Sequence, residues 1–360
     1  MRALAIALVI FWHYPIYGLP FPWKPATWAG VDLFFVLSGY LIGTQLLRPY
    51  TRRARLSYRD FFVRRALRVI PAYLVVLAAY FLIPGFRERP TIAPLWRFLT
   101  FTLNFGLDAG QAFSQGWSLC VEEHFYLLLP LLVPVLMRKP GTARTATLAV
   151  AIVLGGMLLR GALWIHCISP HYLSSSTPGR YLEVIYYPTY NRLDGLLTGV
   201  LVAALRLFRP LCWDRLANHG NALLAAGVLV LAGAFWICQS MFSFATAVVG
   251  YPLLAAGFGL LVMGALMPGS LLGRARLWGA PTVALLSYSL YLTHKEVMHL
   301  DNTCLPGVVA AGAPARLLLY GATFALAAGS LYLLVERPAL WLRDRWLAAD
   351  APSRPPAAQS

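Results

Sequence analysis

Residues 244–266 read FATAVVGYPLLAAGFGLLVMGAL, a run of 23 residues without a charged side chain. At a rise of 1.5 Å per residue, a helix of this length extends about 34 Å, more than the roughly 30 Å hydrocarbon core of a bilayer. Residues 221–240 also contain no charged side chain. Because a segment inside lipid must satisfy its own backbone hydrogen bonds, both runs predict membrane-spanning helices.

The whole chain has the same character. Of its 360 residues 59% are hydrophobic and 12% charged, about half the charge of a soluble domain. We therefore expect an all-α, polytopic membrane bundle of about ten transmembrane helices, with residues 1–346 forming one domain and 347–360 a disordered tail. The expected spans lie at approximately 2–18, 30–47, 66–83, 117–137, 143–163, 190–206, 221–240, 244–266, 281–299 and 316–336.

The net charge of +16 follows the expected topology. If the N-terminus is cytoplasmic, 21 of the 30 lysines and arginines fall in inner segments, and every inner connection is basic. This is the positive-inside pattern, with both termini cytoplasmic. We expect a multi-pass protein of the inner (plasma) membrane that contacts lipid, and the charge requires no nucleic-acid partner.

Two segments complicate this topology. Residues 92–107 are apolar but short and contain Pro94, Arg97 and Asn104; counted as a span, they would reverse every later loop. We expect an interfacial or re-entrant piece on the outer side.

The N-terminal apolar run resembles a signal peptide but has no small-residue cleavage site, so we expect an uncleaved first helix.

The cysteines and histidines do not predict a metal site. The five cysteines have no CxxC spacing. Cys167 and Cys304 both fall near outer loops, where they are either a disulfide pair or two small apolar residues. His166 and His171 have the wrong spacing for one helical face, so no metal is expected.

Arginines at the inner edge form the first candidate site. Arg65 and Arg68 are three residues apart and therefore share a helical face. Two guanidinium groups on one face suit a phosphate-bearing ligand. The alternative for both residues is simple positive-inside anchoring. Arg2 opens the first helix on the same side.

Ionisable residues toward the outer side form the second candidate site. His13 follows Arg2 by eleven residues, about 16 Å along a helix. A charged group inside a span costs about 2.5–3.5 kcal/mol, so each calls for a reason. A histidine among carboxylates at one depth suits base-assisted proton removal. The residues expected at this depth, besides His13, are Asp32, Glu122, Glu123, Asp194 and His294.

Adjacent helical residues diverge by about 100°, so only one of Glu122 and Glu123 can face His13. We expect Glu122 to be the partner of His13, and Glu123 to serve helix packing or acceptor binding. Trp117 and Tyr288 are expected in an interfacial aromatic belt. With Asp32, Ser38, Asp194 and His294 they are also candidates for a supporting role at the site. Ser38 and Gly39 are expected to allow close helix packing, Ser38 having no base within sequence reach.

Seven sequence elements follow one another along the chain: Arg2 with His13, the run GVDLFFVLSGYLI from Gly30, Arg65-Ala-Leu-Arg68 with Pro71, the run WSLCVEEHFYLLLP from Trp117, Arg192-Leu-Asp-Gly, SYSLYLTH from Ser287, and Glu336-Arg-Pro. Together they resemble the acyltransferase 3 family of bacterial membrane acyltransferases.

The resemblance implies an acyl-CoA donor, usually acetyl-CoA, entering from the cytoplasm as cosubstrate, with no permanently bound cofactor. It implies O-acylation of a sugar on an envelope polysaccharide, lipid-linked glycan or secreted glycoside. By motif match, His13 is catalytic and Arg2 is required beside it. Arg65 and Arg68 bind the donor, and Glu122 and Glu123 belong to the active-site motif.

We therefore expect an acyl-CoA-dependent O-acetyltransferase, with His13 taking the proton of an acceptor hydroxyl and Glu122 orienting its ring. A covalent acyl-histidine relay is left open. The competing class is a transporter or flippase of a lipid-linked glycan, for which an inverted pair of interrupted helices would be expected and is not found in the sequence.

Overall fold

The computed structural model describes residues 1–14, 27–52, 54, 56–108, 110–138, 141–172, 174 and 176–349, and within these ranges the chain contains helices and no β-strand. The helices are α1 (Arg2–His13), α3 (Gly30–Thr51), α4 (Tyr58–Leu82), α5 (Leu95–Leu99), α6 (Gly116–Met137), α7 (Thr142–Leu163), α8 (Thr177–Tyr181), α9 (Leu193–Phe208), α10 (Pro210–Ala217), α11 (Gly220–Ile237), α12 (Tyr251–Ala265), α13 (Leu271–Arg274), α14 (Ala280–Leu285), α15 (Ser287–Cys304), α16 (Pro306–Ala310), α17 (Ala313–Leu331) and α18 (Arg337–Ala349). Short 3₁₀ and π-helical turns connect several of them.

Seven helical segments in the described part are long and apolar enough to cross a membrane, which confirms an all-helical, multi-pass architecture. They are Gly30–Thr51, Tyr58–Leu82, Gly116–Met137, Ala143–His171, Gly220–Ile237, Thr246–Ala265 and Ala313–Ala348. The pair α9 and α10, bent by 102°, would make an eighth span.

The expected count of ten spans and the side of each terminus stay predictions. Helix α1 has 12 residues, and positions 15–18 of the expected first span lie outside the described residues. Helix α15 is long enough but contains Lys295, Glu296 and Asp301, which make it too polar to qualify by composition alone.

Residues 92–107 do not form a span. Their only helix, α5, has five residues, about 7.5 Å of rise, too short for a bilayer. The non-spanning expectation is therefore confirmed, and the side on which the segment lies stays a prediction. At the other end of the chain, α18 continues to Ala349, and the expected disordered tail stays a prediction. Residues 350–360 lie outside the described part.

Helices α3 and α9 pack with almost no space between their backbones. A Cβ atom on Gly39 would lie 2.0 Å from the carbonyl oxygen of Leu196, and one on Gly199 would lie 2.2 Å from that of Val36. Small residues let membrane helices approach this closely, as expected for Gly39. The contact holds one face of α3 rigidly against α9.

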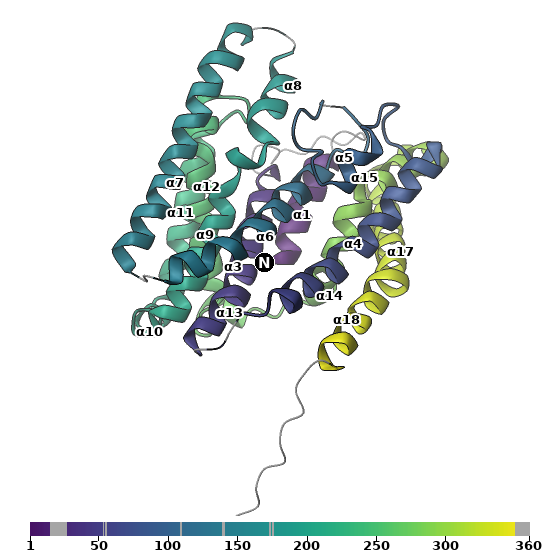
Figure 1. Ribbon diagram of the computed structural model, residues 1–360. Helices are drawn as coiled ribbons and strands as arrows, with labels where there is room; N and C mark the ends of the chain where they lie inside the picture. Colours follow the sequence, from purple (N-terminus) through teal and green to yellow (C-terminus); the bar gives the residue numbers. More distant parts are fainter. Residues whose placement is uncertain are drawn as a thin grey trace, which may run out of the picture.

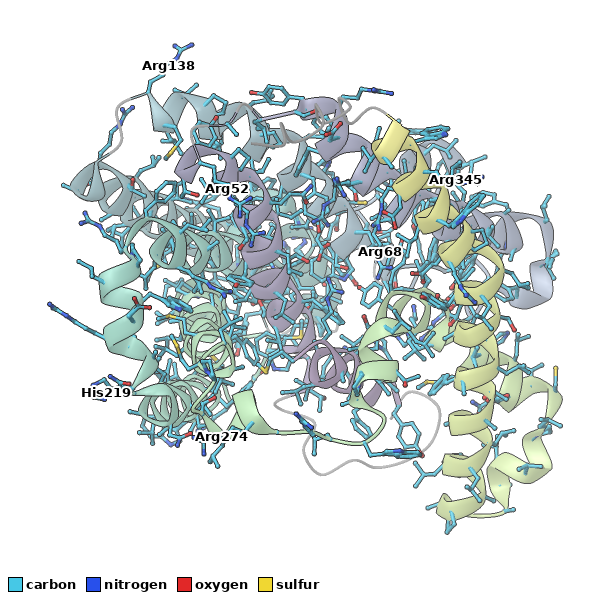
Figure 2. The ribbon with its side chains drawn as sticks, turned by 90° about the horizontal axis from the view of Figure 1, so that it is seen from below. Arg52, Arg68, Arg138, His219, Arg274 and Arg345 are labelled. Carbon is cyan, nitrogen blue, oxygen red and sulfur yellow. The ribbon has the colours of Figure 1, made fainter. Side chains whose placement is uncertain are left out.

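The central helices separate two groups. Figure 1 shows α7, α11 and α12 on one side and α4, α17 and α18 on the other, with α1, α3 and α6 between them. Helix α1 packs against α3, α14 and α15. Viewed from below, Arg138 and Arg274 lie toward the edge of the molecule, whereas Arg68 lies further in (Figure 2).

Candidate active site

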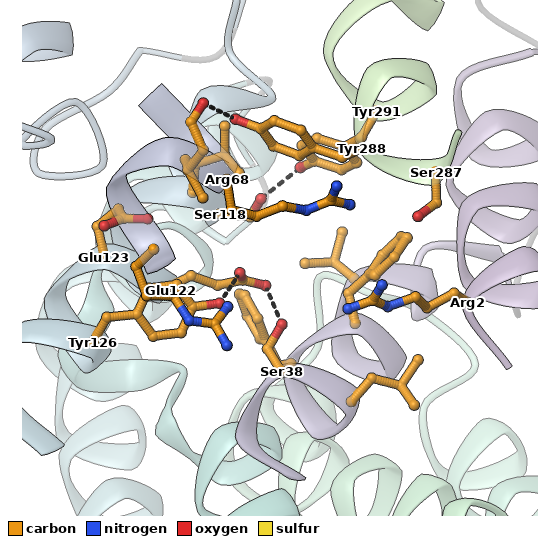
Figure 3. A pocket seen from close by; sticks show the side chains of 17 residues that line it. Arg2, Ser38, Arg68, Ser118, Glu122, Glu123, Tyr126, Ser287, Tyr288 and Tyr291 are labelled. Atoms are coloured by element: carbon orange, nitrogen blue, oxygen red, sulfur yellow. Dashed lines mark hydrogen bonds between the residues drawn. The ribbon is translucent and has the colours of Figure 1, made fainter. Parts of the chain in front are cut away.

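One cavity, named here the arginine pocket, encloses about 100 Å³ between α1, α3, α4, α6 and α15. Figure 3 shows Arg2 and Arg68 entering it from opposite sides. Its polar lining consists of Arg2, Ser38, Arg65, Arg68, Ser118, Glu122, Glu123, Tyr126, Ser287, Tyr288 and Tyr291. Five of the six residues expected to form catalytic or donor-binding groups therefore share one cavity.

Glu122 is held by two hydroxyl groups. Ser38 Oγ donates to its Oε1 at 2.9 Å, and Tyr126 OH donates to its Oε2 at 2.5 Å (Figure 3). Tyr126 follows Glu122 by one helical turn, so the i, i+4 spacing could have predicted this contact. The carboxylate is thereby fixed in the wall of the arginine pocket.

The three arginines of the pocket differ in their partners. Arg68 Nη1 forms a 3.0 Å ion pair with Oε2 of Glu336, which is 2% exposed. Arg65 Nη2 donates to Gln45 Oε1 at 3.4 Å, and its guanidinium lies 4.9 Å from the centre of the Tyr126 ring. Among the described residues, no carboxylate lies within ion-pair distance of Arg2 or Arg65. These two cations are the better candidates for an anionic ligand.

The second cavity, the histidine pocket, encloses about 110 Å³ and is lined by His13 with several aromatic and small polar side chains. His13 Nδ1 lies 2.9 Å from the Val9 carbonyl oxygen and 3.2 Å from Nε2 of His294. The aromatic lining consists of Trp12, Trp28, Trp117, Tyr186, Tyr187, Phe242 and Tyr291, and the polar lining of Thr27, Ser114 and Gln115.

The expected pairing of Glu122 with His13 is wrong. Glu122 shares the arginine pocket with Arg2, and Glu123 lines that pocket as well, whereas His13 contacts His294. Helix α6 begins at Gly116, so Glu122 lies six residues, about 9 Å, into the helix. Glu122 therefore lines the cavity at the Arg2 end of α1, and His13 lines the other cavity.

Asp32 and Asp194 do not join His13 either. Asp32 accepts from Arg192 Nη2 at 2.8 Å, and Asp194 is paired with Arg160 at 2.8 Å; all four side chains are buried. The Arg192 guanidinium also lies 4.0 Å from the centre of the Tyr251 ring. These buried ion pairs connect α7 and α3 to the start of α9. Each carboxylate is buried because an arginine distant in sequence neutralises its charge.

Two aromatic residues and one serine also differ from expectation. Trp117 is 5% exposed and packs on Arg192, and Tyr288 lines the arginine pocket and donates to the Val69 carbonyl oxygen at 2.8 Å. Neither belongs to a lipid-facing belt. Ser38 holds Glu122 in addition to its place on the packed helix α3.

The two cavities share a wall. Val31 of α3 and Tyr291 of α15 line both. Tyr291 OH donates to the Gln115 carbonyl oxygen at 2.9 Å and lies 2.6 Å from Ser118 Oγ, which holds the ring between the cavities. These two side chains therefore contact both cavities.

In the described part of the chain, no cluster of three histidine, cysteine or acidic side chains could hold a metal ion. The five cysteines, Cys167 and Cys304 included, are free there.

Comparison with known proteins agrees with the sequence motifs. Over 325 residues the chain is 29% identical to a putative peptidoglycan O-acetyltransferase, YrhL, of Bacillus subtilis, covering 84% of this chain and 48% of that protein. It is 31% identical over 228 residues to the peptidoglycan O-acetyltransferase OatA of Listeria monocytogenes, covering 59% of this chain and 34% of that protein. The O-acetyltransferase OatA of Staphylococcus aureus is 30% identical over 219 residues, covering 56% and 33%.

The chain thus spans about half, or less, of the length of these relatives. No solved structure matches it significantly. The profile of one family, described as an acyltransferase domain, matches residues 1–335, nearly the whole described chain. The chain therefore belongs to the acyltransferase 3 family, whose motifs its sequence resembles.

Proposed function

We propose that this protein is an inner-membrane O-acetyltransferase that takes an acetyl group from cytoplasmic acetyl-CoA and transfers it to a sugar hydroxyl on the outer side. The acceptor proposed is a cell-wall glycan, because the relatives named above are called peptidoglycan O-acetyltransferases. Both termini are placed in the cytoplasm, so a reporter fused after Arg209 should report cytoplasm; a periplasmic signal would overturn this orientation.

The observation that carries the proposal is the division of α1 between the two cavities. Arg2 lines the arginine pocket and His13 the histidine pocket, about 16 Å apart along one helix. Acetyl transfer across a membrane needs an anion site on the donor side and a base on the acceptor side. A single short helix carries one residue of each kind.

Phosphate recognition supports a donor at the arginine pocket. Arg2 and Arg65 present guanidinium groups without a carboxylate partner in the described part of the chain. Guanidinium groups bind phosphate oxygens through charge-assisted hydrogen bonds. Ser38 and Tyr126 fix the carboxylate of Glu122, which lines the same cavity as Arg2 and Arg65. Its negative charge favours positions of the two guanidinium groups close to it. In this proposal its role is to organise the donor site, and Glu123 lines the same wall.

The aromatic lining supports a glycan at the histidine pocket. Sites for small organic ligands combine apolar and aromatic walls with a few placed polar groups. The C–H faces of a sugar ring pack on indole and phenol rings, while its hydroxyls reach groups such as His13 and Gln115. A hydroxyl held beside His13 is positioned to lose its proton as it attacks.

The proposed reaction balances without a cofactor. Nε2 of His13 takes the proton of the acceptor hydroxyl while the oxygen attacks the thioester carbonyl carbon. The tetrahedral intermediate collapses, the C–S bond breaks, and the thiolate takes the proton back from His13. The products are the sugar acetate ester and free CoA. In the covalent variant, Nε2 attacks the thioester carbonyl carbon and the C–S bond breaks, which expels the CoA thiolate. The acceptor hydroxyl then takes the acetyl group from Nε2, and its proton goes to the thiolate.

The test uses the purified protein in proteoliposomes with radiolabelled acetyl-CoA and a peptidoglycan-derived oligosaccharide. We expect label in the oligosaccharide and slow release of free acetate when the acceptor is omitted. Envelope glycans from a deletion strain should lack an acetyl substituent, which mass spectrometry measures. A flippase would move glycan without consuming acetyl-CoA, and that result would overturn the proposal.

A further inference from the structure

The ring of His13 meets a second imidazole, His294 of α15, from the other end of the chain. Nε2 of His294 lies 3.2 Å from Nδ1 of His13, and the ring centres are 4.9 Å apart. His294 is fully buried and does not line the histidine pocket, whereas His13 does. One imidazole therefore faces the cavity, and the other supports it from behind.

Carbonyl oxygens decide where the protons lie, because they can only accept. Nδ1 of His294 lies 2.9 Å from the Tyr291 oxygen and 3.2 Å from the Leu290 oxygen, so this nitrogen carries the hydrogen. In neutral His294, Nε2 then has a lone pair, which points at Nδ1 of His13. Nδ1 of His13 also lies 2.9 Å from the Val9 oxygen, so it carries a hydrogen shared between two acceptors.

We infer that His294 is a positioning residue that holds His13 in its Nδ1–H form, so that the lone pair of Nε2 faces the histidine pocket. The inference rests on the proposed function, in which that nitrogen is the base or nucleophile. It adds a partner for His13 in the place expected for Glu122. A neutral imidazole occupies the position that a carboxylate takes in a Ser-His-Asp triad.

The surroundings of His294 keep it an acceptor instead of a proton carrier. The next residue, Lys295, is buried and forms a 2.6 Å ion pair with Glu88, and it donates to Ser114 at 3.0 Å. A proton moving onto His294 would place a second buried cation beside Lys295, which is costly. A proton taken up by His13 therefore stays on His13 until the leaving group removes it.

Two amide variants separate this role from packing. In His294→Gln the side-chain amide reaches the position of Nε2, where its oxygen can accept from His13. In His294→Asn the amide reaches only the position of Nδ1 and restores the bond to the backbone. We expect His294→Asn to lower kcat by about 10²–10⁴-fold with an unchanged KM for acetyl-CoA, and His294→Gln to recover at least tenfold of that loss.

The control is His299→Asn, on the same helix but outside both cavities, which should retain normal kcat. Equal losses in His294→Asn and His294→Gln, with both variants folded as judged by thermal unfolding, would overturn the inference. Absence of turnover in the unmodified protein would instead count against the proposed function.

A second measurement does not depend on activity. The protein has seven histidines, and in ¹⁵N-histidine NMR the His13 signals are assigned by their loss in His13→Gln. We expect a neutral His13 ring with the proton on Nδ1, and the same form for His294. A proton on Nε2 of His13 at neutral pH would refute the arrangement whatever the kinetics show.

Discussion

Arg68, which lines the arginine pocket, and Glu336, 268 positions away in the chain, form a 3.0 Å ion pair. Ser289 of α15 also donates to Glu336, so the pair connects α4, α15 and the turn before α18. Because Glu336 neutralises Arg68, this arginine is the least available of the three to an anionic ligand. The expectation that Arg65 and Arg68 both bind the donor stays a prediction, and we propose that Arg68 contributes less to binding than Arg65.

The first prediction tests that division. Glu336→Gln leaves Arg68 without its carboxylate, and Arg68→Ala leaves Glu336 buried and unpaired. Each change should destabilise the protein, and a double-mutant cycle should give a coupling of about 1–3 kcal/mol. Thermal unfolding in detergent measures it. A coupling near zero would show that the contact between Arg68 and Glu336 does not stabilise the protein.

The second prediction concerns donor binding. Arg2→Ala and Arg65→Ala should each raise the Kd for acetyl-CoA by roughly ten- to a hundredfold, because each removes a charge-assisted contact of about 1.5–3 kcal/mol. Arg65→Lys should recover only part of the affinity, since a point charge cannot replace a planar fork. Arg64→Ala, exposed on the same helix, is the control. Unchanged affinity for acetyl-CoA in both Arg2→Ala and Arg65→Ala would show that the donor does not bind in the arginine pocket.

The third prediction separates chemistry from binding. His13→Ala should leave the affinity for acetyl-CoA nearly unchanged, because His13 lies in the other cavity. It should cut turnover by roughly 10²–10⁴-fold, the usual contribution of a positioned general base. Donor binding by calorimetry and transfer in proteoliposomes are measured on the same preparation. Loss of donor binding in this variant would show that donor binding and proton removal are not separated between the two cavities.

The fourth prediction addresses the wall between the cavities. Val31 is 8% exposed and lines both, so Val31→Trp should obstruct the passage of the acetyl group. We expect transfer to fall at least tenfold while donor affinity stays within about threefold. Val31→Ala, which widens the passage, is the control at the same position. If Val31→Trp transfers normally, the acetyl group takes another route.

The fifth prediction concerns the buried pair Asp32–Arg192. Asp32→Asn keeps the shape of the side chain but leaves the guanidinium of Arg192 buried without a counter-charge. It should cost about 3–5 kcal/mol of stability. The folded fraction, isolated by size exclusion, should keep its kcat if Asp32 is structural. Loss of turnover in a folded Asp32→Asn variant would show that Asp32 takes part in catalysis.

Sequence alone determined the membrane class, the family and the separation of Arg2 from His13, because hydropathy, motif order and helical rise are local properties of the chain. The same local rule could also have predicted Tyr126 as a partner of Glu122, one turn away on α6. These inferences need no knowledge of which helix lies beside which.

Only the tertiary structure decided the partners of the ionisable groups. Asp32 faces Arg192, 160 positions away, and His13 faces His294, 281 positions away. Lipid tails are as apolar as leucine, so the apolar surface of a membrane helix does not reveal which face turns inward. That choice depends on packing between helices distant in sequence, as where Gly39 of α3 meets Leu196 of α9. The depth of Glu122 likewise depends on where α6 begins relative to α1, and so Glu122 lies beside the arginines instead of beside His13.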